Sequence, residues 1–313
     1  MSHDSFENGC ACIDGDYVPL SEARISLTDM GFLRCDATYD VVAVWKRKYF
    51  RLNDHFERFE ASWQRLRMSP PLSRGEMREM LDECVRRIEV EDAYVAMILS
   101  RGMALPGVRD PRVMQNRFYA YATPYVWIVK PEDQEVGTHV VVCKETIRIS
   151  NEAVDPKIKS FHWGDMVRGL FEAYDRGGYT AVLTDADGNI TEGPGFNIFA
   201  YHNGVLLTPT TGVLEGITRR TVLELAEELG IEARPESVTA QVLTDSDEIF
   251  ITSTAGGVMP VTTLDGEQVG SGWPGPITLQ LRQRYWQAHD EERWATPVAS
   301  PEDIRHERGF GAP

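Results

Sequence analysis

Lys159 and Glu192 are the two residues whose types and spacing are most suggestive of chemistry. Lys159 lies in the stretch DPKIKSFHWGD, and Glu192 follows 33 positions later in TEGPGFNIF. A lysine amine can form a Schiff base with an aldehyde. A buried carboxylate can keep the ring nitrogen of a bound heterocycle protonated, which makes that ring an electron sink. The pair therefore indicates amine chemistry on a bound aromatic aldehyde.

The surroundings of Lys159 are unusual for a lysine, a residue type that is mostly exposed. Ile158, Phe161 and Trp163 make its neighbourhood apolar. Lys157 is the competing lysine, because residues two apart point to the same face of an extended chain. Glu192 is expected at the end of a strand, where the glycines that follow it permit close backbone approach to a ring.

Three further segments could bind an anion. The sequence Gly-Ile-Thr at 216–218 opens an expected helix, whose free N–H groups and dipole favour negative charge. The run STAGG at 253–257 can present backbone amides in a turn, and Arg58 can supply positive charge. Taken singly, Thr218 could be an ordinary helix cap and Arg58 a surface cation.

These residues require strands and helices to position them, and the pattern predicts an α+β protein with antiparallel sheets and packed helices. Expected strands are 39–45, 49–52, 94–99, 117–122, 138–146, 179–184, 190–192, 196–201, 205–207 and 247–252. Expected helices are 55–68, a helix opened by the capping box Ser73 and Glu76, 161–175, 217–229 and 279–289. We predict an N-terminal domain over 1–125, a linker over 126–136, a C-terminal domain over 137–290 and a mobile polar tail over 291–313, with a cleft between the domains.

Composition excludes several classes of protein. The 313 residues are 42% hydrophobic and 26% charged, as in globular proteins, and no apolar run reaches the length of a membrane span. The net charge of −16 argues against nucleic acid and anionic membranes as partners. The five cysteines have irregular spacing and are expected to be reduced, and no metal site is expected. The polar N-terminus lacks a secretory signal, so we expect a cytoplasmic protein.

Taken together, the segments around Lys159, Glu192, Thr218 and Thr254 closely resemble the fold-type IV pyridoxal phosphate enzymes, the branched-chain and D-amino-acid aminotransferase family. They are most similar to its (R)-selective amine transaminases. The residues from Glu192 match the family pattern Glu-Gly-x-x-x-Asn-Ile-Phe, and the segment that contains Arg58 is similar to His-x-x-Arg-Leu. The resemblance extends from residue 13 to residue 289 and selects Lys159 over Lys157 by the interval to Glu192.

The resemblance implies a two-domain fold with pyridoxal 5'-phosphate in the interdomain cleft. Lys159 would form the Schiff base and move the proton, and Glu192 would contact the pyridine nitrogen. The cofactor phosphate would be bound by Arg58, Ile217, Thr218, Ser253 and Thr254. The substrate would be contacted by Tyr39, Tyr94, Trp163, Arg34 and Arg109.

The two arginines bear on the choice of substrate. The resemblance implies that Arg109, on a mobile loop, grips the carboxylate of a keto acid and moves aside for an uncharged amine. Arg34 stands where close amine transaminases often carry histidine, and a second carboxylate contact there would shift preference toward amino acids. Ala96 replaces the arginine of a Tyr-x-Arg segment in L-branched-chain enzymes, and Gly164 replaces their tyrosine, which weakens the branched-chain interpretation.

The function implied is transfer of an amino group from an (R)-amine to a 2-keto acid such as pyruvate, through the Lys159 Schiff base, a ketimine and pyridoxamine phosphate. A homodimer with shared active sites is implied as well. Three alternatives stay open: a D-amino-acid or branched-chain L-amino-acid aminotransferase, a lyase of the same fold similar to aminodeoxychorismate lyase, and a catalytically silent cofactor-binding protein.

Overall fold

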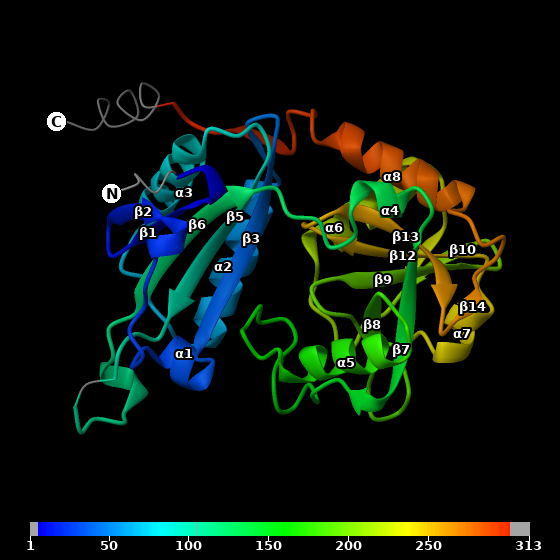
Figure 1. Cartoon of the computed structure of the whole chain (residues 1–313), viewed down its shortest axis with the longest axis horizontal. Helices are drawn as coiled ribbons and strands as arrows, with labels where there is room; N and C mark the ends of the chain where they lie inside the picture. Colours follow the sequence, from blue (N-terminus) through cyan, green and yellow to red (C-terminus); the bar gives the residue numbers. More distant parts are fainter. Residues whose placement is uncertain (1–5, 105, 301–313) are drawn as a thin grey trace. The chain divides into compact units, whose positions relative to one another are not determined.

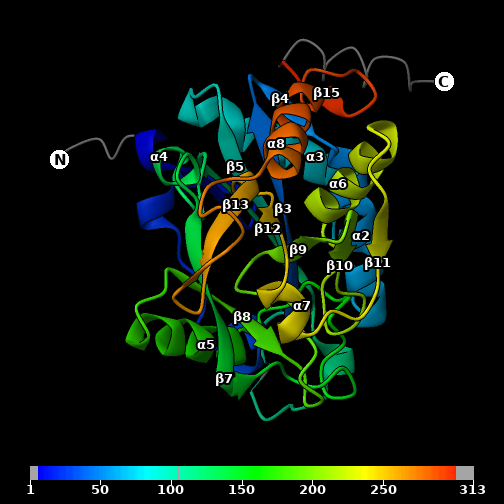
Figure 2. The same cartoon turned by 90° about the vertical axis from the view of Figure 1, so that its right-hand side faces the viewer.

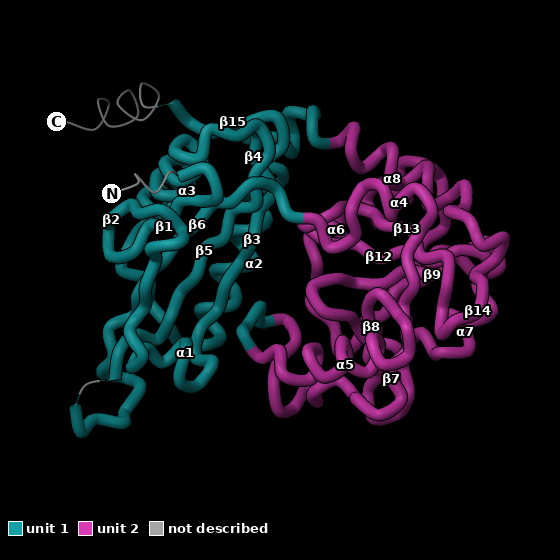
Figure 3. The backbone as a smooth tube through the Cα atoms, in the orientation of Figure 1, with its two compact units in different colours: residues 1–126, 158–161, 289–313 teal, residues 127–157, 162–288 magenta. Residues whose placement is uncertain are grey.

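The computed structural model describes residues 6–104 and 106–300, and these residues divide into two compact units. The first unit, teal in Figure 3, contains residues up to 126, residues 158–161 and residues from 289. The second unit contains 127–157 and 162–288. Each unit has its own sheet, and each is described separately below.

The first unit is built on an antiparallel sheet whose strand order, within the described residues, is β15-β4-β3-β5-β6-β1-β2. The strands are β1 (Cys10–Ile13), β2 (Asp16–Pro19), β3 (Ala37–Trp45), β4 (Lys48–Phe50), β5 (Ala93–Ser100), β6 (Arg117–Pro124) and β15 (Ala295–Pro297). The helices are α1 (Met30–Arg34), α2 (Leu52–Arg65) and α3 (Arg74–Ile88), with short 3-10 turns at Phe6–Asn8, Leu20–Glu22 and Pro111–Val113.

Helices α2 and α3 cover one face of this sheet (Figure 1). Their apolar stripes, including Phe56, Phe59 and Leu81, pack against inward-facing residues such as Val42 and Val95. The opposite residues of β3, β5 and β6 point away from this core because side chains alternate along a strand. The predicted capping box is confirmed: the Ser73 hydroxyl accepts from the Glu76 N–H, and the Glu76 carboxylate accepts from the Ser73 N–H.

We expect the stability of this unit to depend on pH through Asp82, which is buried on α3. Burial raises the pKa of Asp82 to about 6, although Arg78 lies 3.7 Å away and opposes the shift. A carboxyl whose pKa is higher folded than unfolded weakens the fold as pH rises between the two values. We expect Asp82→Asn to raise the Tm at pH 8, where ionisation of Asp82 costs up to about 3 kcal/mol.

The expected gain should shrink below pH 5, where the wild-type carboxyl is increasingly protonated in both states. Thermal unfolding of both proteins at pH 5 and pH 8 measures the difference. Asp110→Asn is the control, because Arg112 lowers the pKa of this exposed carboxyl to about 2 and its loss brings no gain at pH 8. An equal effect of Asp82→Asn at both pH values would contradict the prediction.

The second unit is built on a mixed sheet with the order β11-β10-β9-β12-β13-β7-β8, and β14 pairs with β13. The strands are β7 (Thr138–Ile147), β8 (Thr180–Thr184), β9 (Asn197–His202), β10 (Val205–Thr208), β11 (Ala233–Pro235), β12 (Glu248–Ser253), β13 (Gly257–Leu264) and β14 (Glu267–Gln268). Within the described residues, β7 pairs in parallel with β8 and β13, and β10 with β11. The helices are α4 (Pro131–Gln134), α5 (Gly164–Asp175), α6 (Ile217–Glu228), α7 (Ala240–Thr244) and α8 (Pro276–Ala288).

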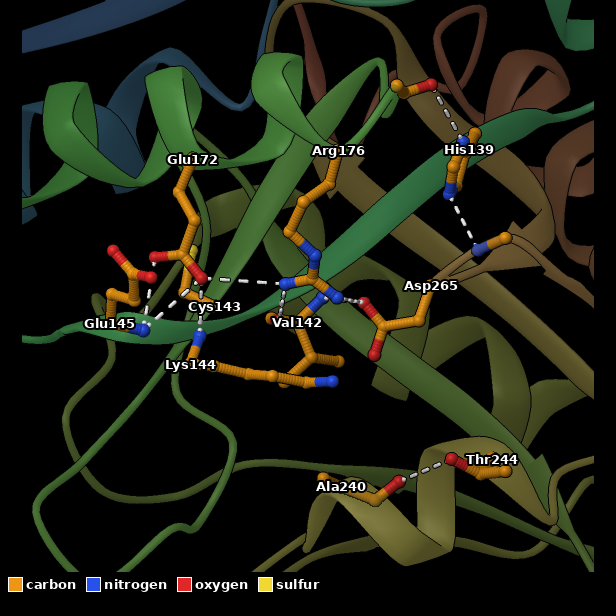
Figure 4. A network of polar contacts seen from close by, with 12 residues as sticks. His139, Val142, Cys143, Lys144, Glu145, Glu172, Arg176, Ala240, Thr244 and Asp265 are labelled. Atoms are coloured by element: carbon orange, nitrogen blue, oxygen red, sulfur yellow. Dashed lines mark hydrogen bonds and ion pairs between the residues drawn. The ribbon is translucent and has the colours of Figure 1, made fainter.

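Helix α5 lies along β7 and β8 in both views (Figures 1 and 2). A polar network fixes it there: the Glu172 carboxylate accepts the backbone N–H groups of Lys144 at 2.6 Å and Glu145 at 3.2 Å (Figure 4). It also accepts the Thr146 N–H at 3.0 Å. Arg176 donates to the Val142 carbonyl at 2.8 Å and pairs with Asp265 at 2.5 Å. The Glu172 carboxylate thus pairs with backbone N–H groups of β7 at the point where the register between β7 and β8 shifts. It helps to fix the backbone that leads to residue 148.

The α+β class is confirmed, while the boundaries inside the chain differ from those expected. The expected linker contains α4, and the Gln134 amide donates to the Val129 carbonyl at 2.7 Å inside the second unit. Residues 158–161 belong to the first unit, although they lie within the expected C-terminal domain. The expected mobile tail supplies β15, paired with β4; its residues 301–313 lie outside the described part.

The described residues contain neither a membrane-spanning helix nor a group of metal-binding side chains. None of their helices is long and apolar enough to cross a membrane. None of their His, Cys, Asp and Glu side chains form a group that could hold a metal ion. All five cysteines are described, and each is a free thiol.

Candidate active site

Lys159 is fixed through its backbone to strand β3 of the first unit. Its carbonyl accepts the Tyr39 N–H at 3.0 Å and the Thr38 hydroxyl at 2.8 Å. Its own N–H points to the Ser62 hydroxyl on α2 at 3.4 Å. The half-buried side chain places Nζ 4.5 Å from the centroid of the Tyr39 ring, which Phe161 also contacts at 4.5 Å. The amine therefore has a defined position beside an aromatic wall.

The structure distinguishes Lys159 from the competing Lys157. Residues 156–158 form a turn, so the extended chain that would point both amines to one face is absent there. Lys157 is exposed and pairs with exposed Glu215 at 2.9 Å, within the second unit. An exposed ion pair of this kind contributes little to stability. Lys157 has the position of a surface lysine, and Lys159 does not.

The sheet face opposite α2 and α3 carries tyrosines from three strands. Tyr39 and Tyr94 were expected to contact substrate, and both are half-buried on this face. Tyr121 on β6 joins them and was not expected. Burial raises the pKa of Tyr94, and the nearby Tyr121 and Tyr39 add to the increase. The Tyr94 hydroxyl therefore stays protonated at neutral pH and can donate a hydrogen bond.

Arg58 does not stand alone on α2, as the sequence had suggested. Its guanidinium forms a fork with the buried Asp40 carboxylate, with Nε–Oδ2 at 2.7 Å and Nη2–Oδ1 at 2.8 Å. His55 Nδ1 lies 2.7 Å from the same carboxylate. Burial alone would raise the pKa of Asp40, but Arg58 and His55 hold it below its usual range. Asp40 thereby fixes the cation expected to bind phosphate, and it neighbours the strand residues that bind Lys159.

The two expected substrate arginines are exposed. Arg34 is the last residue of α1, and Arg109 lies in the loop between β5 and β6. Within the described residues, neither arginine contacts Lys159 or the tyrosines of this face. Their proposed grip on a carboxylate stays a prediction.

Glu192 is buried in the second unit, where two donors hold it. Oε1 accepts from Nη2 of Arg148 at 3.1 Å, and Oε2 accepts the Leu214 N–H at 2.8 Å. The glutamate follows an isolated bridge between Thr184 and Ile190 rather than ending a regular strand. A buried carboxylate needs a partner of this kind to remain ionised.

Arg148 connects Glu192 to a second carboxylate. Its Nη1 pairs with Asp165 at 2.5 Å, and Asp165 also accepts the Ile149 N–H at 2.8 Å. These donors lower the pKa of Asp165, although burial opposes them. Within the described residues, the buried Nε of Arg148 has no hydrogen-bond partner. A buried donor without a partner is costly, so this N–H fits an acceptor that a bound group supplies.

The helix that we expect to bind an anion begins where the sequence predicted. Gly216 is the N-cap of α6, and no side chain caps it, so Thr218 lies buried inside the first turn and is not the cap. The first N–H groups of a helix have no intrahelical acceptor and are available to an anion. A side chain at Gly216 would place its Cβ 2.1 Å from Asn197 Oδ1, so glycine permits this approach.

The run 253–257 forms the expected turn at the end of β12. Ser253 Oγ accepts the Ala255 N–H at 3.2 Å, and half-buried Thr254 follows Ser253 directly. Gly257 has a φ of +70°, and a Cβ there would meet Tyr285 at 2.7 Å. The turn therefore depends on glycine, and it belongs to the same unit as Thr218.

Trp163 is the N-cap residue of α5 in the second unit, and its ring would be 3.4 Å from a Cβ at Gly195. It thus lies near the glycines that follow Glu192. Within this unit the structure brings Trp163 to the Glu192 loop. Within the first unit it brings Lys159 to Tyr39, and Arg58 to the same strand.

Sequence reasoning missed Asp40, Arg148 and Tyr121. Asp40 is an acidic residue within the apolar strand 39–45, and a buried charge requires a partner. Arg58 on the next helix could therefore have been predicted as that partner. Arg148 closes a β-rich run, and the expected burial of Glu192 called for such a cation. Tyr121 alternates with core residues on β6, so it points away from the core. That it shares a face with Tyr39 follows only from the order of the strands in the sheet, which the sequence does not give.

Comparison with known proteins gives a consistent result. Residues 37–264 match the sequence model of the family described as amino-transferase class IV. The D-alanine aminotransferase of Bacillus licheniformis is 30% identical over 271 residues, covering 86% of this chain and 93% of that protein. The branched-chain-amino-acid aminotransferase of Salmonella typhimurium strain LT2 is 30% identical over 261 residues, covering 80% of this chain and 84% of that protein.

Solved structures are similar as well. The branched-chain amino acid aminotransferase of Thermobaculum terrenum, in its PLP-form, is 28% identical with a TM-score of 0.82 and covers 94% of this chain and 100% of that one. The Escherichia coli branched-chain amino acid aminotransferase is 26% identical with a TM-score of 0.87, covering 93% and 100%. The chain belongs to the class IV aminotransferase family. It is an aminotransferase of the fold-type IV architecture.

Proposed function

We propose that the protein transfers an amino group from an (R)-amine to a 2-keto acid such as pyruvate, with pyridoxal 5'-phosphate as cofactor. The observation that carries the proposal is the placement of Lys159, held through its backbone by β3 with its amine beside Tyr39. Such a lysine is positioned for reaction, whereas Lys157 is exposed and paired.

The residues present fit pyridoxal phosphate. When bound, the cofactor supplies an aldehyde for the amine and a ring that withdraws electrons from the substrate. Lys159 would hold its aldehyde carbon, and Glu192, whose negative charge is stabilised by Arg148, would accept a hydrogen bond from the ring nitrogen and keep it protonated. The buried, unpartnered Nε of Arg148 is, among the described residues, a donor suited to an acceptor on a bound group.

The phosphate would be held by donors that differ in kind. The first-turn amides of Ile217 and Thr218 offer N–H groups and the positive end of the α6 dipole. Ser253 and Thr254 offer hydroxyls, and Arg58, in the orientation set by Asp40, offers charge. Amide, hydroxyl and guanidinium groups are the kinds of donor that bind a phosphate group.

Lys159 has a second task as proton carrier. With a substrate amine bound in its place, the Lys159 amine would serve as the base for the proton on the substrate carbon and, once protonated, as the acid that returns it. Positioned general bases contribute factors of about 10²–10⁴. The hydrogen bonds from Tyr39 and Thr38 to its carbonyl fix the main chain from which the Lys159 amine extends.

An uncharged donor is supported by the composition of the tyrosine face. The paired rows of β3, β5 and β6 at this face contain Tyr39, Tyr94, Tyr121 and small or apolar residues. Arg117, at the start of β6, is the cation of these described rows, and its Nε is already paired with Asp14 at 3.1 Å. The rows thus offer apolar ring surface and neutral hydroxyls rather than an unpaired cation, which suits an uncharged donor. The (R) hand of the donor rests on the sequence resemblance.

A second candidate is a D-amino-acid or branched-chain L-amino-acid aminotransferase. The names of the similar proteins, D-alanine and branched-chain-amino-acid aminotransferases, favour it. Exposed Arg34 or Arg109 would then have to supply the contact to the donor carboxylate. The two candidates differ only in the donor, and one experiment separates them.

Mixing the purified holoenzyme with single donors should convert the bound cofactor to its pyridoxamine form, followed by absorbance. We expect (R)-1-phenylethylamine to react faster than its (S) enantiomer and faster than D-alanine or L-leucine. Faster reaction with D-alanine or L-leucine would assign the second candidate. Release of pyruvate from a substrate without any amino acceptor would instead indicate a lyase.

We also propose a homodimer that shares its active sites. Four apolar side chains in the segment 25–33 are at least half exposed: Ile25, Leu27, Phe32 and Leu33. Exposed apolar groups of this kind are typical of association surfaces. Light scattering on the holoenzyme measures the mass, and a monomer with full activity would contradict the proposal.

A further inference from the structure

Tyr121 lies on the same face of the sheet as Tyr39 and Tyr94. On β6, Tyr121 pairs with Ala96 of β5, which in turn pairs with Val41 of β3, so Tyr121 and Tyr94 are diagonal neighbours on one face. Diagonal neighbours are about 7–8 Å apart, which long aromatic side chains bridge. Burial raises the pKa of Tyr121, with Tyr39 adding to the increase, so this hydroxyl also keeps its proton.

Within residues 6–104 and 106–300, none of the three hydroxyls has a hydrogen-bond partner. The hydroxyl of Thr123, which pairs with Tyr94 in the sheet register, is buried and likewise lacks a partner there. Tyr119, next on the same face, differs because its hydroxyl donates to buried Asp29 at 2.8 Å. The Thr123 hydroxyl is buried, whereas the three tyrosine hydroxyls remain accessible, so they can donate to acceptors that a bound molecule brings.

We propose that Tyr121 determines acceptor specificity by donating a hydrogen bond, together with Tyr39 and Tyr94, to the carboxylate of the 2-keto acid. This inference rests on the proposed function, and it names a residue that the sequence resemblance does not assign. The position of the Lys159 amine, 4.5 Å from the Tyr39 ring centroid, places the cluster beside the reacting group.

Neutral hydroxyls suit a site that must accept two unlike molecules. One surface has to bind a carboxylate in one half-reaction and an uncharged amine in the other. A buried guanidinium left without its carboxylate carries a large cost, whereas an unpaired hydroxyl costs much less. The tyrosine rings also offer apolar surface to a donor that has no carboxylate. The same face can therefore serve both substrates without moving a charge.

The test measures the two half-reactions of the Tyr121→Phe holoenzyme separately by absorbance. A hydrogen bond to a charged acceptor is lost, so reaction of the pyridoxamine form with pyruvate should slow about 10–100-fold. Reaction with (R)-1-phenylethylamine, and with the acceptor butanone, should change by less than about threefold because neither has a carboxylate. Tyr119→Phe is the matched control and should leave the preference for pyruvate over butanone unchanged.

An equal loss with pyruvate, butanone and the amine would overturn the inference, because a purely structural defect affects all three. An unchanged rate with pyruvate would overturn it too. If none of the tested amines and amino acids converts the cofactor of the wild-type protein to its pyridoxamine form, the proposed function fails and the inference fails with it. If the wild-type enzyme is active but Tyr121→Phe changes the rates with pyruvate and butanone equally, the proposed function stands and only the inference is wrong.

Discussion

Replacing Lys159 by alanine should abolish transamination and prevent reduction of the bound cofactor onto the protein by borohydride. The variant loses both the covalent attachment and the proton carrier, and the second loss alone is worth about 10²–10⁴-fold. The structure supports this assignment with a fixed backbone and a half-buried amine beside Tyr39. Turnover of (R)-1-phenylethylamine with pyruvate measures the loss.

Lys157→Ala is the matched control for this variant. It removes a lysine two residues away whose amine is exposed and paired with exposed Glu215. Pairs of this type contribute about 0–1 kcal/mol, so folding and activity should be retained within about threefold. If Lys159→Ala keeps its activity and Lys157→Ala loses it, the lysine has been assigned to the wrong residue.

Local features of this chain could be predicted well. The capping box at Ser73 and Glu76 and the start of α6 after Gly216 follow from residues within a few positions of each other, and both were found. The α+β class followed from the same kind of signal, since helical and strand periodicities depend on neighbouring residues.

Features that depend on contacts between distant segments could not be predicted in this way. Strand β15 pairs with β4 across more than two hundred residues, and its short sequence has no strand pattern of its own. Residues 158–161 belong to the first unit because Thr38 and Tyr39 bind the Lys159 carbonyl, a contact that no local pattern encodes.

The supporting residues of the candidate site illustrate the same limit. Family-like patterns identified Arg58 and Glu192, but the partners Asp40 and Arg148 became clear only from distances. The physical requirement that a buried charge be paired predicts that partners exist, without saying which residues they are. A search for oppositely charged residues in adjacent apolar strands would have narrowed the choice to a few positions.

Replacing Glu192 by glutamine should slow turnover about 10²–10³-fold while leaving the protein folded, a loss of the size seen when one preorganised electrostatic contact is removed. Glutamine keeps the shape and can still accept the Leu214 N–H that Glu192 now accepts at 2.8 Å. It cannot hold a ring nitrogen protonated, so the cofactor becomes a weaker electron sink. The rate of the half-reaction with (R)-1-phenylethylamine measures this loss directly.

The glutamine variant is preferable to alanine because of Arg148. Removing one partner of a buried ion pair costs about 3–5 kcal/mol, so Glu192→Ala would combine a folding defect with the chemical one. In Glu192→Gln, Arg148 loses its acceptor at position 192 but keeps its pair with Asp165 at 2.5 Å, so the Tm should fall less than in Glu192→Ala. Asp165→Asn weakens the same network without touching Glu192, and it should slow the half-reaction far less. An active Glu192→Gln enzyme would show that another residue holds the ring nitrogen.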